Sequence, residues 1–356
     1  MQNDLKKILV VRKFKLGDSL LFTPVMEALH HRYPGIKIDL ITGSEFGLEF
    51  WRHYPYIGRI WNENDLYTRP NWRERWAFLR SIRRRHYDAV LVSSMETGYA
   101  LKAFLMGIPK RYGFGRAFYY SPGWDRWKWL YTDHLDDHEP REVQRNLQLL
   151  KFLGIESNRT ELSFYPEPEA RLRLLGRIES IPWNHTVIIS LVGHSPGRSL
   201  PMELWEKIGP GLVFPEGWGA VLIGTSRDYQ ANLAYARLLN VPFLNLAGKT
   251  DLSELFYLIK ASRGLISVDS GIMHLATIPQ IPMFIIWGPG NEQVFSPLHY
   301  SSSEIHLFNS VHTCGPCQEP CPDLACYHRI DPNQIVQSFN QWIIRQHQVL
   351  PDCSAQ

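Results

Sequence analysis

The chain has 356 residues, of which 44% are hydrophobic and 21% charged, and its formal net charge is +3. This usage is typical of a globular protein and excludes a largely disordered or collagen-like chain. Five cysteines are too few for a secreted disulfide scaffold. We see no apolar run long enough for a membrane span, and the apolar core near the N-terminus is too short for a signal peptide. We therefore expect a cytoplasmic, two-domain protein with no nucleic-acid partner.

The positive charge is concentrated in one part of the chain. Residues 69–116 hold eleven Lys or Arg and three acidic residues, an excess of eight positive charges. Eight aromatic side chains lie in the same stretch. A basic, aromatic-rich segment indicates an anionic partner, while a set of solvated helix faces is the alternative interpretation.

Short apolar runs alternate with amphipathic segments in the first half of the chain. The expected strands cover 7–13, 36–42, 58–61 and 88–94. A helix is expected directly after Gly17-Asp18-Ser19, with Pro24 early in it, where a missing N–H costs least. Two further helices are expected at 71–86 and 97–106. This order predicts βαβ units and a parallel sheet with right-handed crossovers.

A second alternation follows a proline-rich break. Its expected strands cover 186–193, 219–224, 242–248, 264–270 and 282–288. Its expected helices cover 201–209, 227–239, 251–262, 271–278 and 332–347, the last with Asp331 as N-cap. We therefore expect an α/β protein, with ligands at the carboxyl ends of the strands. The expected segments are a first domain at 1–165, a linker at 166–185, a second domain at 186–331, and a helix and tail at 332–356.

The first candidate site is the turn from Lys15 to Ser19, where a strand ends and a helix begins. Asp18 is expected at the carboxyl edge of the sheet, where a carboxylate can act as a general base. An aspartate before a helix is also a standard N-cap, and the turn alone favours the cap. The spaced glycines of a dinucleotide fingerprint are missing, and the sequence contains no Walker loop.

The second candidate site opens a helix in the second half of the chain. Asp269, Ser270 and Gly271 follow an expected strand, and His274 lies five residues after Asp269. A helix N-terminus attracts phosphate through its free N–H groups and its dipole. The structural alternative makes Asp269 an N-cap and His274 a buried packing residue.

Two loops after expected strands add further candidates beside that helix. One contains Arg198, whose planar guanidinium can neutralise a diphosphate, although an arginine at the surface of a loop is the plainer interpretation. The other is the segment Gly-Thr-Ser-Arg-Asp that contains Ser226. Both loops are expected at the ligand-binding edge of the second sheet.

Four cysteines lie within 13 residues near the C-terminus, spaced C-x2-C-x3-C-x4-C: Cys314, Cys317, Cys321 and Cys326. In a cytosolic chain such a cluster favours a metal over disulfides, and four thiolates suit zinc or an iron centre. The spacing matches no standard zinc finger, so two local disulfides or four thiols in a structured loop stay as alternatives.

Several of these motifs together resemble glycosyltransferase family 9, the bacterial heptosyltransferases. The segment ILVVRKFKLGDSLLFTPVMEALHHRYPGIKIDLITG resembles the family's first strand, its [R/K]-x-x-x-x-GD turn and its TPxxxxL helix. The D-S-G-x-x-H-x-A stretch at 269–276 and PMFIIWGPGNEQVFSP at 282–297 resemble its later motifs. A cysteine-rich segment near the C-terminus also occurs in many members. The resemblance covers residues 7–345.

The resemblance implies a GT-B fold, with two Rossmann-like domains facing a central cleft. It implies inverting transfer of a heptose from ADP-heptose to the lipopolysaccharide inner core, with no cofactor needed for catalysis. Asp18 would be the general base, and Lys15 would help to keep its pKa low. The implied donor-binding residues are Arg198, Ser226, Asp269, Ser270, Gly271 and His274. The expected acceptor-binding residues are Lys15, Arg111 and Arg116.

Two positions depart from the family's pattern. Arg198 stands near the usual lysine, and Ser226 stands where some relatives place a glutamate against the nucleotide ribose. A lipopolysaccharide core or lipid A-type acceptor would bring the protein into peripheral contact with the inner membrane.

Two alternatives stay open. One is a family member with another donor or a protein acceptor, for which the cysteine cluster is relevant because some relatives that modify proteins carry metal-binding cysteines. The other is a non-catalytic nucleotide-sugar-binding protein.

Overall fold

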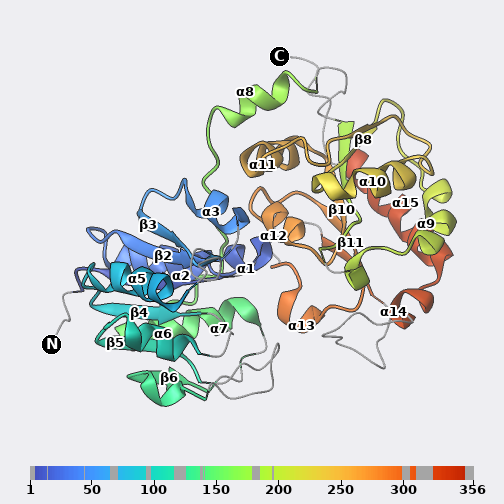
Figure 1. Cartoon of the computed structure of the whole chain (residues 1–356). Helices are drawn as coiled ribbons and strands as arrows, with labels where there is room; N and C mark the ends of the chain where they lie inside the picture. Colours follow the sequence, from blue (N-terminus) through green and yellow to red (C-terminus); the bar gives the residue numbers. More distant parts are fainter. Residues whose placement is uncertain are drawn as a thin grey trace. The chain divides into compact units, whose positions relative to one another are not determined.

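The structure is a computed structural model of the chain (Figure 1). It describes residues 5–13, 15–43, 45–64, 71–93, 98–115, 126–136, 139, 141–178, 185–194, 196–298, 305–309 and 324–348. The chain divides into two compact units, Met1–Tyr165 and Pro166–Gln356. Each unit is built around one six-stranded sheet. The expected α/β class, with two Rossmann-like units, is therefore confirmed.

The first sheet has the strand order β3-β2-β1-β4-β5-β6, and all its pairings are parallel. The order reverses between β1 and β4, which is the topological switch point where open α/β sheets bind ligands. The strands are β1 (Ile8–Val11), β2 (Ile38–Thr42), β3 (Ile57–Asn62), β4 (Ala89–Val92), β5 (Lys110–Phe114) and β6 (Asp133–Leu135).

Helices cover the first sheet because its central strands are apolar on both faces. The helices are α1 (Leu16–Leu20), α2 (Thr23–Arg32), α3 (Glu45–Trp51), α5 (Trp72–Arg83), α6 (Tyr99–Leu105) and α7 (Glu142–Gln148), with short 3-10 turns η1 (Lys128–Leu130) and η2 (Leu149–Leu153). Leu9 and Val11 of β1 belong to one core cluster with Ile82 of α5 and Ala103 of α6. Side chains alternate along a strand, so the rest of β1 is buried on the opposite face.

The second sheet has the order β12-β11-β10-β7-β8-β9, again with every pairing parallel. Counted from its own first strand, β7, this is the topology of the first sheet, and its switch point lies between β7 and β10. The strands are β7 (Thr186–Ser190), β8 (Gly219–Leu222), β9 (Phe243–Asn245), β10 (Gly264–Val268), β11 (Met283–Trp287) and β12 (Ile305–Asn309).

The last helix of the chain is part of the second unit's core. Phe339 and Trp342 of α15 pack with Phe284 of β11 at ring-centroid distances of 5.6 and 5.8 Å. Asp331 accepts a hydrogen bond from the N–H of Asn333 at 2.9 Å, which confirms it as the cap of α15. The helices of the unit are α8 (Ala170–Leu175), α9 (Met202–Ile208), α10 (Tyr229–Ala236), α11 (Leu252–Ala261), α12 (Gly271–Thr277), α13 (Glu292–Phe295), α14 (Ala325–His328) and α15 (Pro332–Gln348). The 3-10 turns are η4 (Pro196–Arg198), η5 (Gly209–Gly211) and η6 (Ser226–Asp228).

Among the described residues, nine strands lie where the apolar runs predict them, and three further strands, β5, β6 and β12, are not expected from the sequence. β5 reads Lys-Arg-Tyr-Gly-Phe and shows no apolar alternation, and β6 has only three residues. Both β6 and β12 are edge strands, so the neighbouring strand supports them more than their own composition does. In place of one helix after Ser19, the structure has α1, which already begins at Leu16, and α2, which has Pro24 at its start.

The segment expected as a linker, 166–185, packs in part on the second unit. Within it, α8 places Arg173 against α11, with Nε of Arg173 3.4 Å from Oε1 of Glu254. The N–H of Glu167 also donates to Oγ of Ser253 at 3.0 Å. These contacts make the first half of the segment part of the second unit. No helix in the described ranges is both long and apolar enough to cross a bilayer.

Candidate active site

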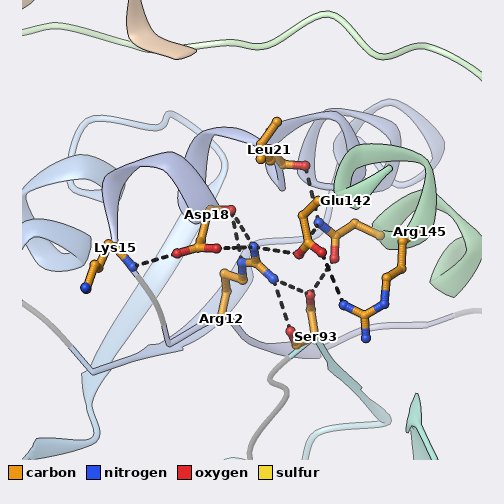
Figure 2. Close-up of polar contacts among 8 residues, drawn as sticks. Arg12, Lys15, Asp18, Leu21, Ser93, Glu142 and Arg145 are labelled. Carbon is orange, nitrogen blue, oxygen red and sulfur yellow. Dashed lines mark hydrogen bonds and ion pairs between the residues drawn. The ribbon is translucent and has the colours of Figure 1, made fainter. Parts of the chain in front are cut away.

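Asp18 lies in α1, just after β1, at the carboxyl edge of the first sheet (Figure 2). Lys15 is the N-cap of this short helix, so Asp18 stands at the third helical position and the N-cap alternative is wrong. Oδ2 of Asp18 accepts a hydrogen bond from the main-chain N–H of Lys15 at 3.3 Å. The Asp18 side chain keeps 18% of its surface exposed, so solvent or a ligand can reach it.

A buried arginine holds the main chain of Asp18. Arg12 follows β1, and its Nε and Nη2 donate to the main-chain oxygen of Asp18 at 3.0 and 2.7 Å. Its Nη1 donates to Oγ and the main-chain oxygen of Ser93, which follows β4, at 2.9 and 3.1 Å. Arg12 therefore joins the two strands of the switch point. Its ion pair with the Asp18 carboxylate is longer, with Nη2 and Oδ1 3.7 Å apart.

Burial raises the pKa of the Asp18 carboxyl above its ordinary value, and the nearby Glu142 charge acts in the same direction. The Arg12 charge, the N–H of Lys15 and the Lys15 charge all lower this pKa but do not outweigh burial. Lys15 therefore lowers the pKa of Asp18, as expected, but burial outweighs it and the net shift is upward. A carboxylate with a raised pKa is a stronger proton acceptor than an ordinary aspartate.

Helix α7 brings a second carboxylate to this edge of the sheet. Glu142 is fully buried, and its Oε1 accepts from Nη2 of Arg12 at 3.1 Å and from Nδ2 of Asn146 at 3.2 Å. Its Oε2 accepts from Nη1 of Arg145 at 3.2 Å. The sequence pattern does not point to this group, because 130 positions separate Glu142 from Arg12. The one available signal was that Arg12 is the cation of the [R/K]-x-x-x-x-GD turn.

The expected acceptor-binding residues fall in different settings. Lys15 is exposed, three positions from Asp18. Arg111 lies near the start of β5, where Nε donates to the main-chain oxygen of Leu130 and Nη1 to that of Ile108, both at 2.6 Å. Two of the three guanidinium nitrogens of Arg111 therefore donate to main-chain oxygens. Arg116 lies outside the described residues.

The second unit places another arginine–aspartate pair at its own switch point. Asp269 directly follows β10 and is 4% exposed. Nη1 of Arg198, in the loop after β7, lies 3.3 Å from Oδ2 of Asp269, while the Arg198 side chain is 33% exposed. The hydroxyl of Tyr327 donates to the main-chain oxygen of Arg198 at 3.2 Å and so holds the loop. The topology therefore brings together two residues that are 71 positions apart in the sequence.

Two glycines allow the chain to close around this pair. A Cβ at Gly290 would collide with Oδ2 of Asp269, and a Cβ at Gly193 would lie 2.6 Å from Cβ of Arg198. Nε1 of Trp287 donates to the main-chain oxygen of Gly290 at 2.8 Å and fixes that turn. Any larger residue at either position would displace the Arg198–Asp269 pair.

Helix α12 carries the remaining residues of this motif. Ser270 is its N-cap, so the interpretation of Asp269 as the cap is wrong. Oγ of Ser270 lies 3.1 Å from Oγ of Ser267, and Gly271 is the first helical residue. His274 is buried, as the packing alternative expected, and burial together with the Arg198 charge lowers its pKa to about 4. The imidazole is therefore neutral at pH 7 and can form hydrogen bonds but carries no charge.

Ser226 opens the 3-10 turn η6 after β8, and its side chain is exposed. Thr225 is the N-cap of this turn, and Asp228 completes a capping box, because its Oδ2 accepts from the N–H and Oγ1 of Thr225 at 2.6 and 2.8 Å. Gly248 has φ +71°, and a Cβ there would lie 2.6 Å from Cα of Ser226. The structure therefore places Ser226 in a constrained turn at the carboxyl edge of the second sheet.

The expected metal cluster falls mostly outside the described residues. Cys314, Cys317 and Cys321 belong to that part of the chain, while Cys326 is buried in α14. Within the ranges that the structure describes, no three His, Cys, Asp or Glu residues are arranged to hold a metal ion. The metal site at the four cysteines therefore stays a prediction.

Known proteins match the chain over most of its length. Lipopolysaccharide heptosyltransferase 2 of Escherichia coli K12 is 26% identical over 369 residues, which cover 96% of this chain and 99% of that protein. The solved structure of E. coli ADP-heptose lipopolysaccharide heptosyltransferase II superposes with a TM-score of 0.73, at 20% identity over 96% of this chain and 99% of that one. E. coli heptosyltransferase WaaC with ADP gives a TM-score of 0.67 at 16% identity, over 94% and 99%.

The two sheets and these superpositions identify the fold as GT-B. Residues 75–328, well over half of the chain, match the family model for glycosyltransferase family 9 (heptosyltransferase). The chain therefore belongs to glycosyltransferase family 9 and is a glycosyltransferase.

Proposed function

We propose that this enzyme transfers a heptose from ADP-heptose to the inner core of lipopolysaccharide, with inversion at the anomeric carbon and Asp18 as the general base. The observation that carries the proposal is the Asp18 carboxylate, which is partly exposed at the first switch point while Arg12 holds its main chain. The heptosyltransferases to which the chain is similar support the choice of sugar and of acceptor class.

The chemistry of the base follows from its surroundings. In the proposed reaction the acceptor hydroxyl attacks the anomeric carbon from the face opposite ADP, and the bond between that carbon and the diphosphate oxygen breaks. Asp18 takes the proton of the hydroxyl as the new bond forms. Burial raises the pKa of Asp18, which suits it to accept this proton near neutral pH. A single displacement of this kind inverts the configuration at the sugar carbon.

The donor is proposed to bind at the second switch point. In the part of the chain that the structure describes, Asp269 is the one partner of the Arg198 side chain, and that side chain is a third exposed. Its guanidinium can therefore bind a diphosphate oxygen and stabilise the charge that develops on the leaving ADP. The neutral imidazole of His274 adds hydrogen bonding without further charge.

Further donor contacts are proposed at the ends of β10 and β8. Ser270 and Gly271 present main-chain N–H groups in the first turn of α12, and such groups bind phosphate oxygens. Ser226, exposed in η6, is proposed to face the nucleotide ribose, where a hydroxyl can replace a carboxylate as a hydrogen-bond acceptor.

The acceptor is proposed to bind at the first unit. Lys15 is exposed three residues from Asp18, so an acceptor phosphate held by its ammonium would lie close to the base. Arg111 and Arg116 are proposed to add to this positive field, Arg111 through its charge, since its hydrogen bonds go to main-chain carbonyls. We also propose that the basic segment 69–116 brings the enzyme into peripheral contact with an anionic membrane surface.

A structural metal at the cysteine cluster is a separate part of the proposal. Four thiolates of Cys314, Cys317, Cys321 and Cys326 would suit zinc or iron. The proposed transfer takes no step through this metal. Elemental analysis of the purified protein tests the site, and less than one equivalent of zinc plus iron, in protein whose thiols are reduced, would contradict it.

The experiment that tests the proposed function is Asp18→Asn, which keeps an oxygen to accept from the N–H of Lys15 but cannot take a proton. We expect turnover to fall by about 10²–10⁴-fold, with the dissociation constant of ADP changed by less than about twofold. Product formation from ADP-heptose and a deep-rough core acceptor measures the first, and calorimetry measures the second.

Asp331→Asn, at the cap of α15, is the matched control and should keep full turnover. Near-normal turnover in Asp18→Asn would contradict the base assignment. A wild-type enzyme that binds ADP-heptose but forms no product would favour the non-catalytic alternative.

A further inference from the structure

We propose that Glu142 is a positioning residue for Asp18. Its buried carboxylate draws the Arg12 guanidinium toward α7, so that Arg12 clamps the main chain of Asp18 but makes only a long ion pair with its carboxylate. The inference deepens the proposed function and rests on the role of Asp18 as the base. The Glu142 charge also acts on the pKa of Asp18 directly, but the hydrogen bonds of its carboxylate go to Arg12, Arg145 and Asn146.

The geometry around Nη2 of Arg12 shows two carboxylates competing for one guanidinium (Figure 2). This nitrogen lies 3.1 Å from Oε1 of Glu142, within hydrogen-bond distance, and 3.7 Å from Oδ1 of Asp18. The same nitrogen also donates to the main-chain oxygen of Asp18 at 2.7 Å. Charge-assisted hydrogen bonds strengthen as they shorten, so Glu142 holds the stronger side-chain contact with Arg12.

Glu142 is itself held in place from several sides. Its two oxygens accept from Asn146 and Arg145 of the same helix, each at 3.2 Å. Oδ1 of Asn146 accepts from Oγ of Ser93 at 2.8 Å, and its Nδ2 donates to the main-chain oxygen of Leu21 at 3.4 Å. Helix α7 is thereby tied to the loop after β4 and to the end of α1. In this fully buried setting the charges act on one another with little screening by water.

Besides Arg12, Asp18 and Glu142, the group contains a fourth charged side chain, Arg145, which pairs with Glu142. Arg145 is fully buried, and its guanidinium carbon lies 4.0 Å from the ring centroid of Phe114 on β5. The group therefore contains two cations, Arg12 and Arg145, and two carboxylates, Asp18 and Glu142. Arg145 attracts Glu142 in the same way that Glu142 attracts Arg12. A change of charge at either end of this chain is transmitted to Asp18 through Arg12.

The charges that bear on Asp18 come from three elements: Arg12 after β1, Lys15 at the start of α1, and Glu142 on α7. Glu142 raises the pKa of Asp18, while the two cations lower it. Without the Glu142 charge, Arg12 would pair more closely with the ionised Asp18 and lower its pKa. Without the Arg145 charge, Glu142 would hold Arg12 more strongly, and the pKa of Asp18 would rise.

Two substitutions of opposite charge effect test the inference in the full-length enzyme. Glu142→Gln keeps an oxygen for Arg12 and Asn146 but removes the charge, and Arg145→Met keeps an unbranched side chain against Phe114. We expect Glu142→Gln to lower the pKa of Asp18 by about one unit and Arg145→Met to raise it by about one unit. Carbon-13 NMR titration of the Asp carboxyls measures this, with Asp18→Asn assigning the signal.

The pH profile of kcat/KM for heptose transfer gives a second readout, since its acidic limb should move with the Asp18 titration in both variants. Glu63→Gln is the matched control. Glu63 is a 2% exposed carboxylate of the same unit that pairs with Lys13 and Lys102 and is not among the charges that bear on Asp18. In Glu63→Gln, the titration of Asp18 should coincide with that in the wild type.

Opposite shifts in the two variants support the inference, because a merely structural role would lower the melting temperature without moving the titration both ways. An Asp18 titration that stays in place, or moves in the same direction in both variants, overturns it. If Glu142→Gln fails to fold, Arg145→Met decides alone, and an Asp18 pKa that does not rise overturns the inference. Full turnover by Asp18→Asn would instead refute the proposed function, whatever the titrations show.

Discussion

The two units place an arginine–aspartate pair at the same point of the same topology, but they expose opposite partners. In the first unit Arg12 is fully buried and Asp18 keeps 18% exposure. In the second, Asp269 is 4% exposed and Arg198 keeps 33%. The first site therefore offers a carboxylate to a ligand and hides the cation, and the second offers a cation and hides the carboxylate.

This inversion matches the two tasks that the proposed reaction assigns. A proton acceptor needs a reachable carboxylate held in position, which the main-chain hydrogen bonds of Arg12 provide. A diphosphate needs a reachable cation, and a buried carboxylate behind it fixes the orientation of that cation. The two sheets thus share one strand order, but their sites offer a ligand opposite charges. The sign of the charge depends on which side chain of the pair is buried.

The largest effect is expected when the arginine of the first pair is removed. Arg12→Met leaves Glu142 buried without its Arg12 partner and removes the link between β1 and β4. We expect the free energy of unfolding of the first unit to fall by about 3–5 kcal/mol, which urea titration followed by tryptophan fluorescence would measure. Arg12→Lys should recover part of this loss, because it restores the charge without the planar hydrogen bonds. A fall below about 1 kcal/mol in Arg12→Met would contradict the structural role of the first arginine.

The second prediction concerns pH and the buried imidazole beside the second pair. The unfolded chain protonates His274 near its ordinary pKa of 6.5, and the folded chain does so only at about 4. Because the folded-state pKa is depressed, the unfolded state binds the proton first, and stability is lost as the pH falls through this window. We expect the wild type to lose ~3 kcal/mol more than His274→Gln between pH 7 and pH 4.

Urea unfolding of both proteins across that pH range measures the difference. His328→Gln, which removes an exposed imidazole, serves as the control, and its curve should follow that of the wild type. Parallel curves for the wild type and His274→Gln would show that the buried histidine does not stay neutral in the folded protein.

The smallest effect on stability is expected at the partly exposed arginine of the second pair. Arg198→Met should lower the free energy of unfolding by about 1–2 kcal/mol, because the Arg198 side chain is partly solvated while Asp269 is left buried without this partner. It should weaken ADP binding by about tenfold, because one charge-assisted contact to the diphosphate is lost. Calorimetry with ADP measures the affinity, and Arg198→Lys should retain most of it. Unchanged ADP affinity in Arg198→Met would contradict the assignment of Arg198 to the donor site.

Much of the fold could be predicted from local pattern. The apolar runs of β1, β4, β7, β10 and β11 are buried along their whole length, so their composition identifies them without reference to partners. The strand β5 could not be found in this way, because Lys110 and Arg111 give it no apolar alternation. Its place in the sheet depends on pairing with β4 and β6.

The residues of the candidate sites divide in the same way, into those that a local pattern reveals and those that it does not. Asp18, Asp269 and His274 were recognisable because each lies in a local motif directly after an apolar strand. Glu142 and Arg145 lie in a helix with no such motif, and nothing near them in the sequence points to Asp18. Their role depends on a buried contact that spans 130 positions and exists only in the folded unit.

The amino-acid sequence alone is therefore enough to predict the alternation of strands and helices and the residues that follow each central strand. Both depend on periodicity and on turn chemistry, which are local properties. The folded chain alone shows that Arg12 is buried and Arg198 partly exposed, and that Glu142 shares Arg12 with Asp18. Burial and charge pairing belong to the folded chain, because they depend on which distant segments the topology brings to the same edge of a sheet.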